Sequence, residues 1–186
     1  MQANVIEVVH DEKVPNPPSV IVKELLHFHR KMLKDVFQTN DSLLLAAKGL
    51  GLETHIVPQV MKQLVASNGL IFVLNFEGSD EVDFFKTVVP QIKTLHSAEF
   101  SQEERQQIYS EGGVVFVTAR VLCVDMLTKR VPVADIAGML VLHAHSLKET
   151  SNVAFILRLY RQFNEVCWDN NVHKMKLLPN KNSEAL

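Results

Sequence analysis

The fold is decided by one stretch of the chain, Gly112-Gly113-Val114-Val115-Phe116-Val117-Thr118-Ala119-Arg120-Val121-Leu122-Cys123-Val124-Asp125. Its apolar run predicts a buried strand, and the residues after Thr118 predict a helix with an apolar face. Two other segments share this strand-to-turn pattern, Leu43–Gly51 and Met139–Ser146. Strands that alternate with helices predict an α/β fold, with a mostly parallel sheet covered by helices on both faces. The strand ends of such a sheet meet a nucleotide or a nucleic acid.

Composition sets the broad class. The 186 residues are 47% hydrophobic and 22% charged, which is typical of a globular domain with a sizeable core. The net charge of -2 provides no global basic field, so any DNA contact needs a local patch. Cys123 and Cys167 lack the spacing of metal ligands and favour a reducing compartment, with Cys123 expected to be a buried thiol. No secretory signal and no apolar run of the ~20 residues that span a bilayer is present, so no membrane partner is expected.

The chain divides into three parts. Prolines in Val14–Pro18 predict a flexible N-terminal extension over residues 1–18. A folded domain is expected over 19–164, and a divergent polar C-terminal tail over 165–186. The helices expected in the domain are Ser19–Phe37, Thr54–Ala66, Asp80–Gln91, Ser101–Ser110 behind a capping box, Ala119–Leu127 and Asn152–Phe163. The strands expected are Ser42–Ala47, Leu70–Asn75, Ile92–Leu95, Val114–Thr118 and Met139–His143.

The turn after the first strand resembles a phosphate-binding loop that has lost its chemistry. Such a loop needs glycines for close backbone approach, a lysine for the phosphates and a hydroxyl for Mg²⁺. Here Lys48 precedes Gly49 and Gly51, while Leu52 stands at the lysine position and Glu53 at the hydroxyl position. An acidic side chain at that place repels a triphosphate. Gly-x-Gly alone is also compatible with a tight turn, so the sequence predicts no bound cofactor.

The end of the later strand lacks the carboxylates that hold Mg²⁺ and orient water in ATP hydrolysis. It reads Leu142-His143-Ala144-His145. His-x-His occurs in zinc sites, but no third and fourth ligand stand at useful spacing, so we expect no metal and one packed and one solvated histidine. His27 and His29 are expected on the surface. The sequence contains neither paired carboxylates nor a Ser/His/Asp arrangement that would indicate hydrolysis. We therefore predict no catalytic residue.

Several segments together resemble a known family. They are Ser110–Asp125, Ala47–Gly51, Phe72–Asn75, Ala144–Ser146 and Ala154–Gln162. They resemble the N-terminal helicase-like domain of the DNA repair endonuclease XPF family, and the similarity runs in chain order from about Met32 to Asn164. The resemblance implies a RecA-like lobe of superfamily 2 helicase type whose ATPase motifs have decayed. Residues 19–164 would then be this degenerate lobe, in a truncated or short form of the family.

The resemblance also implies a function. It implies an ATPase-dead DNA-binding and scaffolding domain of a structure-specific repair endonuclease, located in the nucleus, acting in nucleotide excision repair, crosslink repair and recombination. DNA at single-strand/double-strand junctions would be bound weakly, through Thr118, Arg120 and Lys48, and repair scaffold proteins would be partners. The family's Glu-Arg-Lys nuclease motif and its helix-hairpin-helix module are not found in this sequence. We therefore expect no nuclease activity and no binding of the small non-catalytic partner subunit.

Two other functions stay open at this point. The chain is also compatible with a regulatory short isoform or fragment that binds the partners of a longer parent. An unorthodox ATP-dependent helicase-type enzyme is the third possibility. Whichever holds, the helix Asn152–Phe163 is expected to bury Val153, Ile156, Leu157 and Tyr160 and to direct Arg158 and Arg161 outward.

Overall fold

The computed structural model describes residues 25–38, 41–47, 49–66, 69–89, 91–95, 100–165 and 174–177. The proposed extension 1–18, the cap at Ser19 and the loop residue Lys48 lie outside the described residues. Most of the tail 165–186 also lies outside them. The division into three parts therefore stays a prediction.

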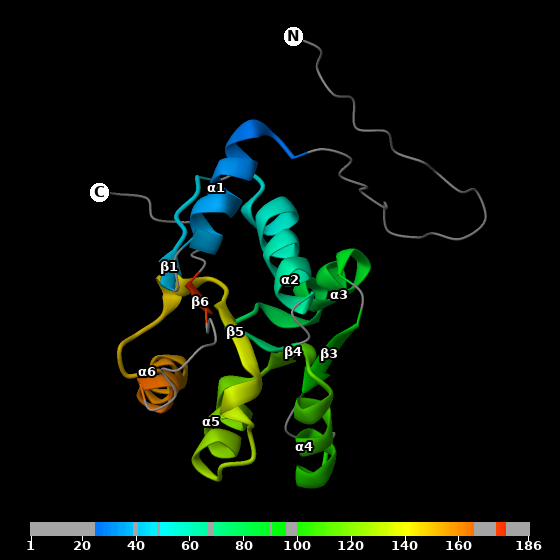
Figure 1. Ribbon diagram of the computed structural model, residues 1–186, viewed down its shortest axis with the longest axis vertical. Helices are drawn as coiled ribbons and strands as arrows, with labels where there is room; N and C mark the ends of the chain where they lie inside the picture. Colours follow the sequence, from blue (N-terminus) through cyan, green and yellow to red (C-terminus); the bar gives the residue numbers. More distant parts are fainter. Residues whose placement is uncertain are drawn as a thin grey trace, which may run out of the picture.

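A six-stranded sheet forms the centre of the domain (Figure 1). Its strands are β1 Asp41–Leu43, β2 Leu70–Leu74, β3 Ile92–Leu95, β4 Gly113–Val117, β5 Ile136–Val141 and β6 Lys174–Leu177. They lie in the order β1-β6-β5-β2-β4-β3, and every neighbouring pair is parallel. Parallel strands need crossover connections, and the segments between the strands supply them.

Helices cover both faces of the sheet. Helices α1 His27–Gln38, α2 Val57–Val65 and α3 Gly78–Val88 pack on one face, and α4 Gln102–Glu111, α5 Ala119–Leu127 and α6 Asn152–Glu165 on the other (Figure 1). The side chains of β2 divide between the two cores, with Ile71 and Val73 on the first face and Phe72 and Leu74 on the second. This alternation follows from the two-residue period of a strand. The α/β architecture predicted from the sequence is therefore confirmed.

The central elements have nearly their predicted bounds. β2, β3, β4 and α5 lie where the sequence placed them, with a difference of one residue at most at each end. The capping box at the start of α4 is present: Glu104 N–H donates to Ser101 Oγ at 3.2 Å, and Ser101 N–H donates to Glu104 Oε2 at 2.7 Å. Strong local signals decide these boundaries, because each is fixed by residues within one turn or one strand.

Several predicted boundaries were wrong. The strand expected over Ser42–Ala47 ends at Leu43, and residues 44–47 belong to no helix or strand. The helix expected to start at Thr54 is already wound from Leu52, through a π-helical turn at Leu52–Ile56. Helix α3 begins at Gly78 with Glu77 as its N-cap residue, so Asp80 lies in the first turn and is not the cap.

Strand β6 is a feature that the sequence analysis did not anticipate. Its residues, Lys174–Leu177, lie in the proposed polar tail, yet they pair with both β1 and β5. The register places Met175 opposite Asp41 on one side and opposite Met139 on the other. β1 therefore joins the sheet through β6 and not through β5. The first strand of the chain forms one edge of the sheet, and β3 forms the other.

Helix α6 packs as its spacing predicted. Val153, Ile156 and Tyr160 are buried in the second core, while Leu157 is half-buried against it. Arg158 and Arg161 are exposed, and Arg161 pairs with Asp41 Oδ2 at 2.8 Å (N–O distance). Within the described ranges, no helix is long and apolar enough to cross a bilayer.

Candidate functional site

Four turns lie at the end of the sheet where the carboxyl ends of the strands meet. Because all strand pairs are parallel, the carboxyl ends of the strands lie together. After β1, β2, β4 and β5 come, respectively, residues 44–51, Asn75–Glu77, Thr118–Arg120 and Leu142–Ser146. These turns include the positions at which the sequence analysis placed a lost phosphate loop, a lost metal-binding end and a DNA contact.

The first turn, which contains Gly49 and Gly51, is covered by histidines. Gly51 has φ 69 and begins the π-helical turn, a conformation that glycine adopts without strain. His29 of α1 is buried, and its Nε2 lies 2.8 Å from the Leu50 carbonyl oxygen, to which it donates. The rings of His29 and His55 meet edge to face, with centroids 5.0 Å apart. The expectation that His29 lies on the surface was wrong, whereas His27 is exposed as expected.

The two positions that would hold a nucleotide and its metal point elsewhere. Leu52 is 9% exposed and belongs to the core formed with Ile56 and Val60. Glu53 is half-buried, and its Oε1 has no hydrogen-bond partner among the described residues. An apolar side chain directed into the core cannot coordinate phosphate. The turn thus has two glycines with positive φ but lacks the lysine and hydroxyl of a phosphate loop at positions 52 and 53.

The turn after β5 is tied to the turn after β2. Asn75 Nδ2 donates to the carbonyl oxygens of Leu142 and His143, at 2.8 and 3.1 Å, and to Ser146 Oγ at 3.1 Å. Buried His143 has φ 48, and its Nε2 lies 2.9 Å from Glu81 Oε1 in α3. Both Asn75, with φ 60, and His143 hold left-handed conformations, which are uncommon outside glycine. These contacts fix the geometry of both turns.

The two histidines of this turn differ as the sequence predicted. His143 is packed, and His145 is exposed. Among the described residues, no group of three or more His, Cys, Asp or Glu side chains could hold a metal ion. The nearest charged partners of His143 are Glu81 and, at 3.8 Å, Glu77. Its surroundings are those of a structural histidine.

The turn after β4 is open. Thr118 is the N-cap residue of α5, with φ -69 and ψ 140, but its hydroxyl makes no capping bond within the part of the chain that the structure describes. Thr118 is half-buried, Arg120 is exposed, and both follow the carboxyl end of β4. A helix N-terminus offers unpaired N–H groups and a partial positive charge, which suit a phosphate. Thr118 and Arg120 therefore both stand at the start of α5, while Lys48 lies outside the described residues.

A buried ion pair anchors this open turn. Asp125 of α5 is fully buried and accepts from Arg105 Nε at 2.8 Å, from Arg105 Nη2 at 3.0 Å and from the Tyr109 hydroxyl at 2.8 Å. Burial, and next the hydrogen bond to Asp125, raise the pKa of the Tyr109 hydroxyl, and the hydrogen bond to Asp125 raises the pKa of Arg105. Helix α5 is thereby fixed to α4. This cluster was not predicted from the sequence. Its signal there is Asp125, an aspartate on the apolar face of a predicted helix.

Cys123 differs from its prediction. It was expected to be buried, but its side chain is half-buried and free. It packs at the margin of the second core.

Comparison with curated proteins finds DNA repair endonucleases. The chain is 36% identical over 141 residues to DNA repair endonuclease XPF of Drosophila melanogaster. The aligned region covers 76% of this chain and 14% of that protein. It is 32% identical over 145 residues to DNA repair endonuclease XPF of Cricetulus griseus, covering 76% and 16%. It is 33% identical over 172 residues to DNA repair protein RAD1 of Saccharomyces cerevisiae, covering 75% and 16%. The chain thus spans about one seventh of the length of the relatives it matches.

Comparison with solved structures finds helicase domains. The Hef helicase domain of Pyrococcus furiosus matches with a TM-score of 0.63 at 18% identity, over 84% of this chain and 34% of that one. The UvsW helicase of Bacteriophage T4 matches with a TM-score of 0.55 at 13% identity, over 94% and 56%. These similarities establish a helicase-type RecA-like α/β lobe. No family model matches the chain.

Proposed function

Over its matched residues the chain belongs to the XPF family of DNA repair endonucleases, and from this premise we propose that it is an ATPase-dead helicase-like module that binds DNA and docks other repair proteins. Its relatives are named as DNA repair endonucleases, and its lobe is of helicase type. In this proposal the chain itself neither hydrolyses ATP nor cleaves DNA. Its place of action is the nucleus, where the DNA is repaired.

One observation carries the proposal: the lysine position of the phosphate loop is a leucine that is part of the core. Leu52 lies among Ile56 and Val60, and Glu53 follows it where a metal-holding hydroxyl is needed. Phosphoryl transfer depends almost wholly on positioned cations around the phosphates. With leucine at the lysine position and glutamate at the hydroxyl position, the loop lacks the cation that binds the phosphates and the hydroxyl that binds Mg²⁺, and the Glu53 carboxylate repels a nucleotide.

The second half of the nucleotide site supports the same conclusion. In a hydrolysing helicase, carboxylates at the end of the later strand hold Mg²⁺ and orient water. Here that end bears Leu142, which is buried, and His143, whose ring is held by Glu81. Glu81 in turn accepts from the Glu77 N–H at 2.5 Å, so its carboxylate is already engaged within α3.

The direct test is nucleotide binding. ATP turnover is measured with and without splayed-arm DNA, and ATP affinity by calorimetry, on the intact chain. We expect no turnover above background and no binding heat. A Gly51→Pro variant, which blocks the positive φ of the turn, is the control. Turnover by the unaltered chain that Gly51→Pro abolishes would contradict the proposal.

DNA cleavage is the second activity to test. A metal-dependent nuclease needs clustered carboxylates, whereas the two pairs of adjacent acids among the described residues lie in the first turns of helices: Asp80 and Glu81 in α3, Glu103 and Glu104 in α4. Negative charge at a helix N-terminus stabilises the helix and needs no other explanation. Labelled stem-loop DNA with Mg²⁺ or Mn²⁺ should stay intact. Cleavage at the junction that disappears on Glu103→Gln or Asp80→Asn substitution would overturn the assignment.

A further inference from the structure

Helices on the second face of the sheet present very different outer surfaces. The exposed positions of α4 are all polar, and include Gln102, Gln106 and Glu111. The exposed positions of α5 include two large apolar side chains, Val124 at 49% and Leu127 at 55% exposure. Both helices pack on the same core, so burial against that core does not account for the difference.

The exposed residues of α5 form one stripe. Arg120, Val124 and Leu127 stand at positions i, i+4 and i+7, which share one side of a helix. Helix α6 packs beside α5 and adds Phe155, which is 39% exposed, and Arg158 one turn further along. We call these five residues the α5–α6 face. Scattered apolar side chains are normal on a surface, but several together on neighbouring helices indicate a binding surface.

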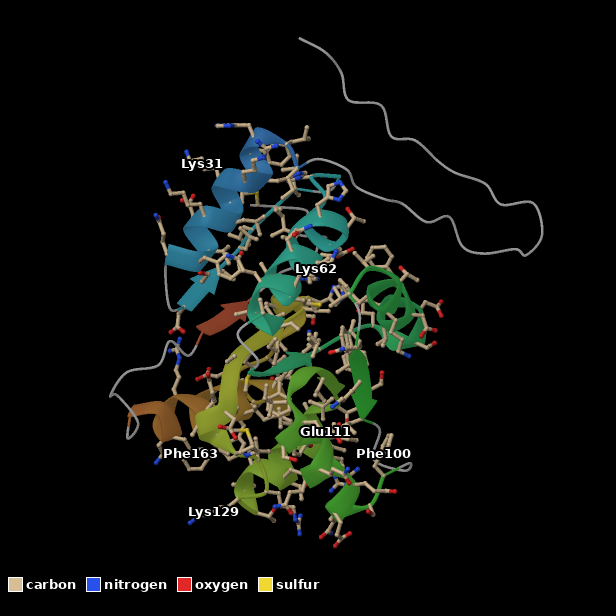
Figure 2. All side chains as sticks on the ribbon, turned by 45° about the vertical axis from the view of Figure 1, so that its right-hand side comes forward. Lys31, Lys62, Phe100, Glu111, Lys129 and Phe163 are labelled. Atoms are coloured by element: carbon tan, nitrogen blue, oxygen red, sulfur yellow. The ribbon has the colours of Figure 1, made fainter. Side chains whose placement is uncertain are left out.

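Charge gives the face a definite preference. Among the described side chains of α5 and α6, the exposed charges are Arg120, Arg158 and Arg161, and of these Arg161 is already paired with Asp41. The single aspartate, Asp125, is buried and occupied by Arg105. Lys129 follows α5 directly and is exposed; Figure 2 shows it and Phe163 of α6 at the same end of the molecule. The apolar residues are therefore bordered by positive charge.

We propose that the α5–α6 face binds an acidic amphipathic helix of another protein, an inference that rests on the proposed scaffolding role. An apolar stripe on such a helix would cover Val124, Leu127 and Phe155, and its flanking carboxylates would meet the arginines. DNA fits less well, because phosphates have no apolar complement for these side chains. A second copy of this chain fits less well too, because it would bring like charges together.

The experiment uses a labelled peptide of about 18 residues, with leucines at i, i+3, i+4 and i+7 and glutamates between them. Its binding to the intact chain is followed by fluorescence anisotropy. The test variant is Val124→Gln with Leu127→Gln, which removes apolar contacts on exposed helix positions without adding charge. We expect its affinity to fall by about tenfold or more, the size of effect that loss of an anchoring cluster has. Gln106→Ala on α4 is the matched control and should bind as the unaltered chain does.

A second peptide, with lysine in place of every glutamate, tests the charge preference. It should bind at least about tenfold more weakly than the acidic peptide, and the difference should shrink as salt is added. Equal affinity of the two peptides overturns the proposal, as does equal affinity of the double variant and the unaltered chain, or no binding of the acidic peptide. DNA binding is measured on the same samples. Intact DNA binding by the unaltered chain, together with no binding of the acidic peptide, rejects this inference and leaves the DNA-binding role standing. The double variant keeps Arg120 and should bind DNA as the unaltered chain does.

Discussion

Two strand–turn–helix units have their turns at the carboxyl ends of the strands, but one turn is covered by side chains and the other is accessible. In the unit from β1 to α2, the turn is covered by His29 and His55, and its leading side chain, Leu52, is in the core. In the unit from β4 to α5, the hydroxyl of Thr118 makes no capping bond among the described residues, and Arg120 is exposed. The first unit is closed by the protein's own side chains, whereas the second is available to a ligand.

The comparison separates the residues that shape a turn from the residues that would bind a ligand. The glycine turn of the first unit is still needed, because it redirects the chain from β1 into the helix that packs on the first core. A lysine and a hydroxyl for phosphate and metal are not needed for that packing, and Leu52 and Glu53 stand at those two positions. The second unit keeps its helix N-terminus open, since α5 is anchored further along by Asp125. Backbone geometry and ligand chemistry thus depend on different residues.

The largest expected effect is on the anchor of the open unit. Asp125→Ala leaves Arg105 and the Tyr109 hydroxyl without their partner in the protein interior. Removing one partner of a buried ion pair typically costs about 3–5 kcal/mol of unfolding free energy. The measurement is the urea midpoint and the melting temperature. A loss of unfolding free energy of this size would show that Asp125 anchors the unit from β4 to α5.

The control for this prediction is Asp83→Ala. Asp83 pairs with Lys86 at 3.1 Å on the exposed side of α3, and exposed pairs contribute little. The two variants remove the same carboxylate from the same kind of element and differ in burial. If they melt alike, Asp125 does not anchor α5.

The next effect concerns the closed unit. Leu52→Lys restores the lysine of a phosphate loop, but places an ammonium group in the core position that Leu52 now fills. We expect a loss of about 2–4 kcal/mol, somewhat eased if the long side chain reaches water, and no gain of ATP binding. Leu50→Lys, at an exposed position of the same turn, is the control and should be nearly neutral. ATP binding by Leu52→Lys would mean that the turn is only one substitution away from function.

A smaller effect separates the two glycines of the closed turn. Both have positive φ, so alanine at either position costs about 1–2 kcal/mol in backbone strain. At Gly51 a Cβ would also lie 2.7 Å from His55 Cδ2, whereas at Gly49 no atom lies within 4 Å. Gly51→Ala should therefore melt below Gly49→Ala. Equal melting would show that His55 yields easily and does not close the turn.

The sequence predicts elements well where the deciding residues are neighbours. The bounds of α5, the capping box of α4 and the burial of Ile156 follow from patterns within a few residues. The same patterns predicted the α/β class, because strands that alternate with helices leave few other arrangements.

Features that depend on distant residues could not be predicted. β6 reads Lys-Met-Lys-Leu, too short and too polar to signal a strand, and it exists through its pairing with β1 and β5. His29 lies on a helix with several charged neighbours, and its burial follows from contacts with residues more than 20 positions later in the chain, the Leu50 carbonyl oxygen and the His55 ring. The Thr118–Arg120 surface was anticipated as a DNA contact from the resemblance and stays a prediction.

The smallest expected effect is the one that tests the open unit as a DNA contact. Arg120→Ala should weaken binding to splayed-arm DNA by a few-fold, about 1 kcal/mol or less, since a single exposed phosphate contact contributes little. The binding constant should also depend less steeply on salt, by about one unit of slope, because one fewer counterion is released. Lys31→Ala is the control: Figure 2 shows Lys31 on α1, on the first face of the sheet and away from α5. Equal affinity and equal salt slope for Arg120→Ala and the unaltered chain would remove Arg120 from the site, and would leave the open turn with a structural role alone.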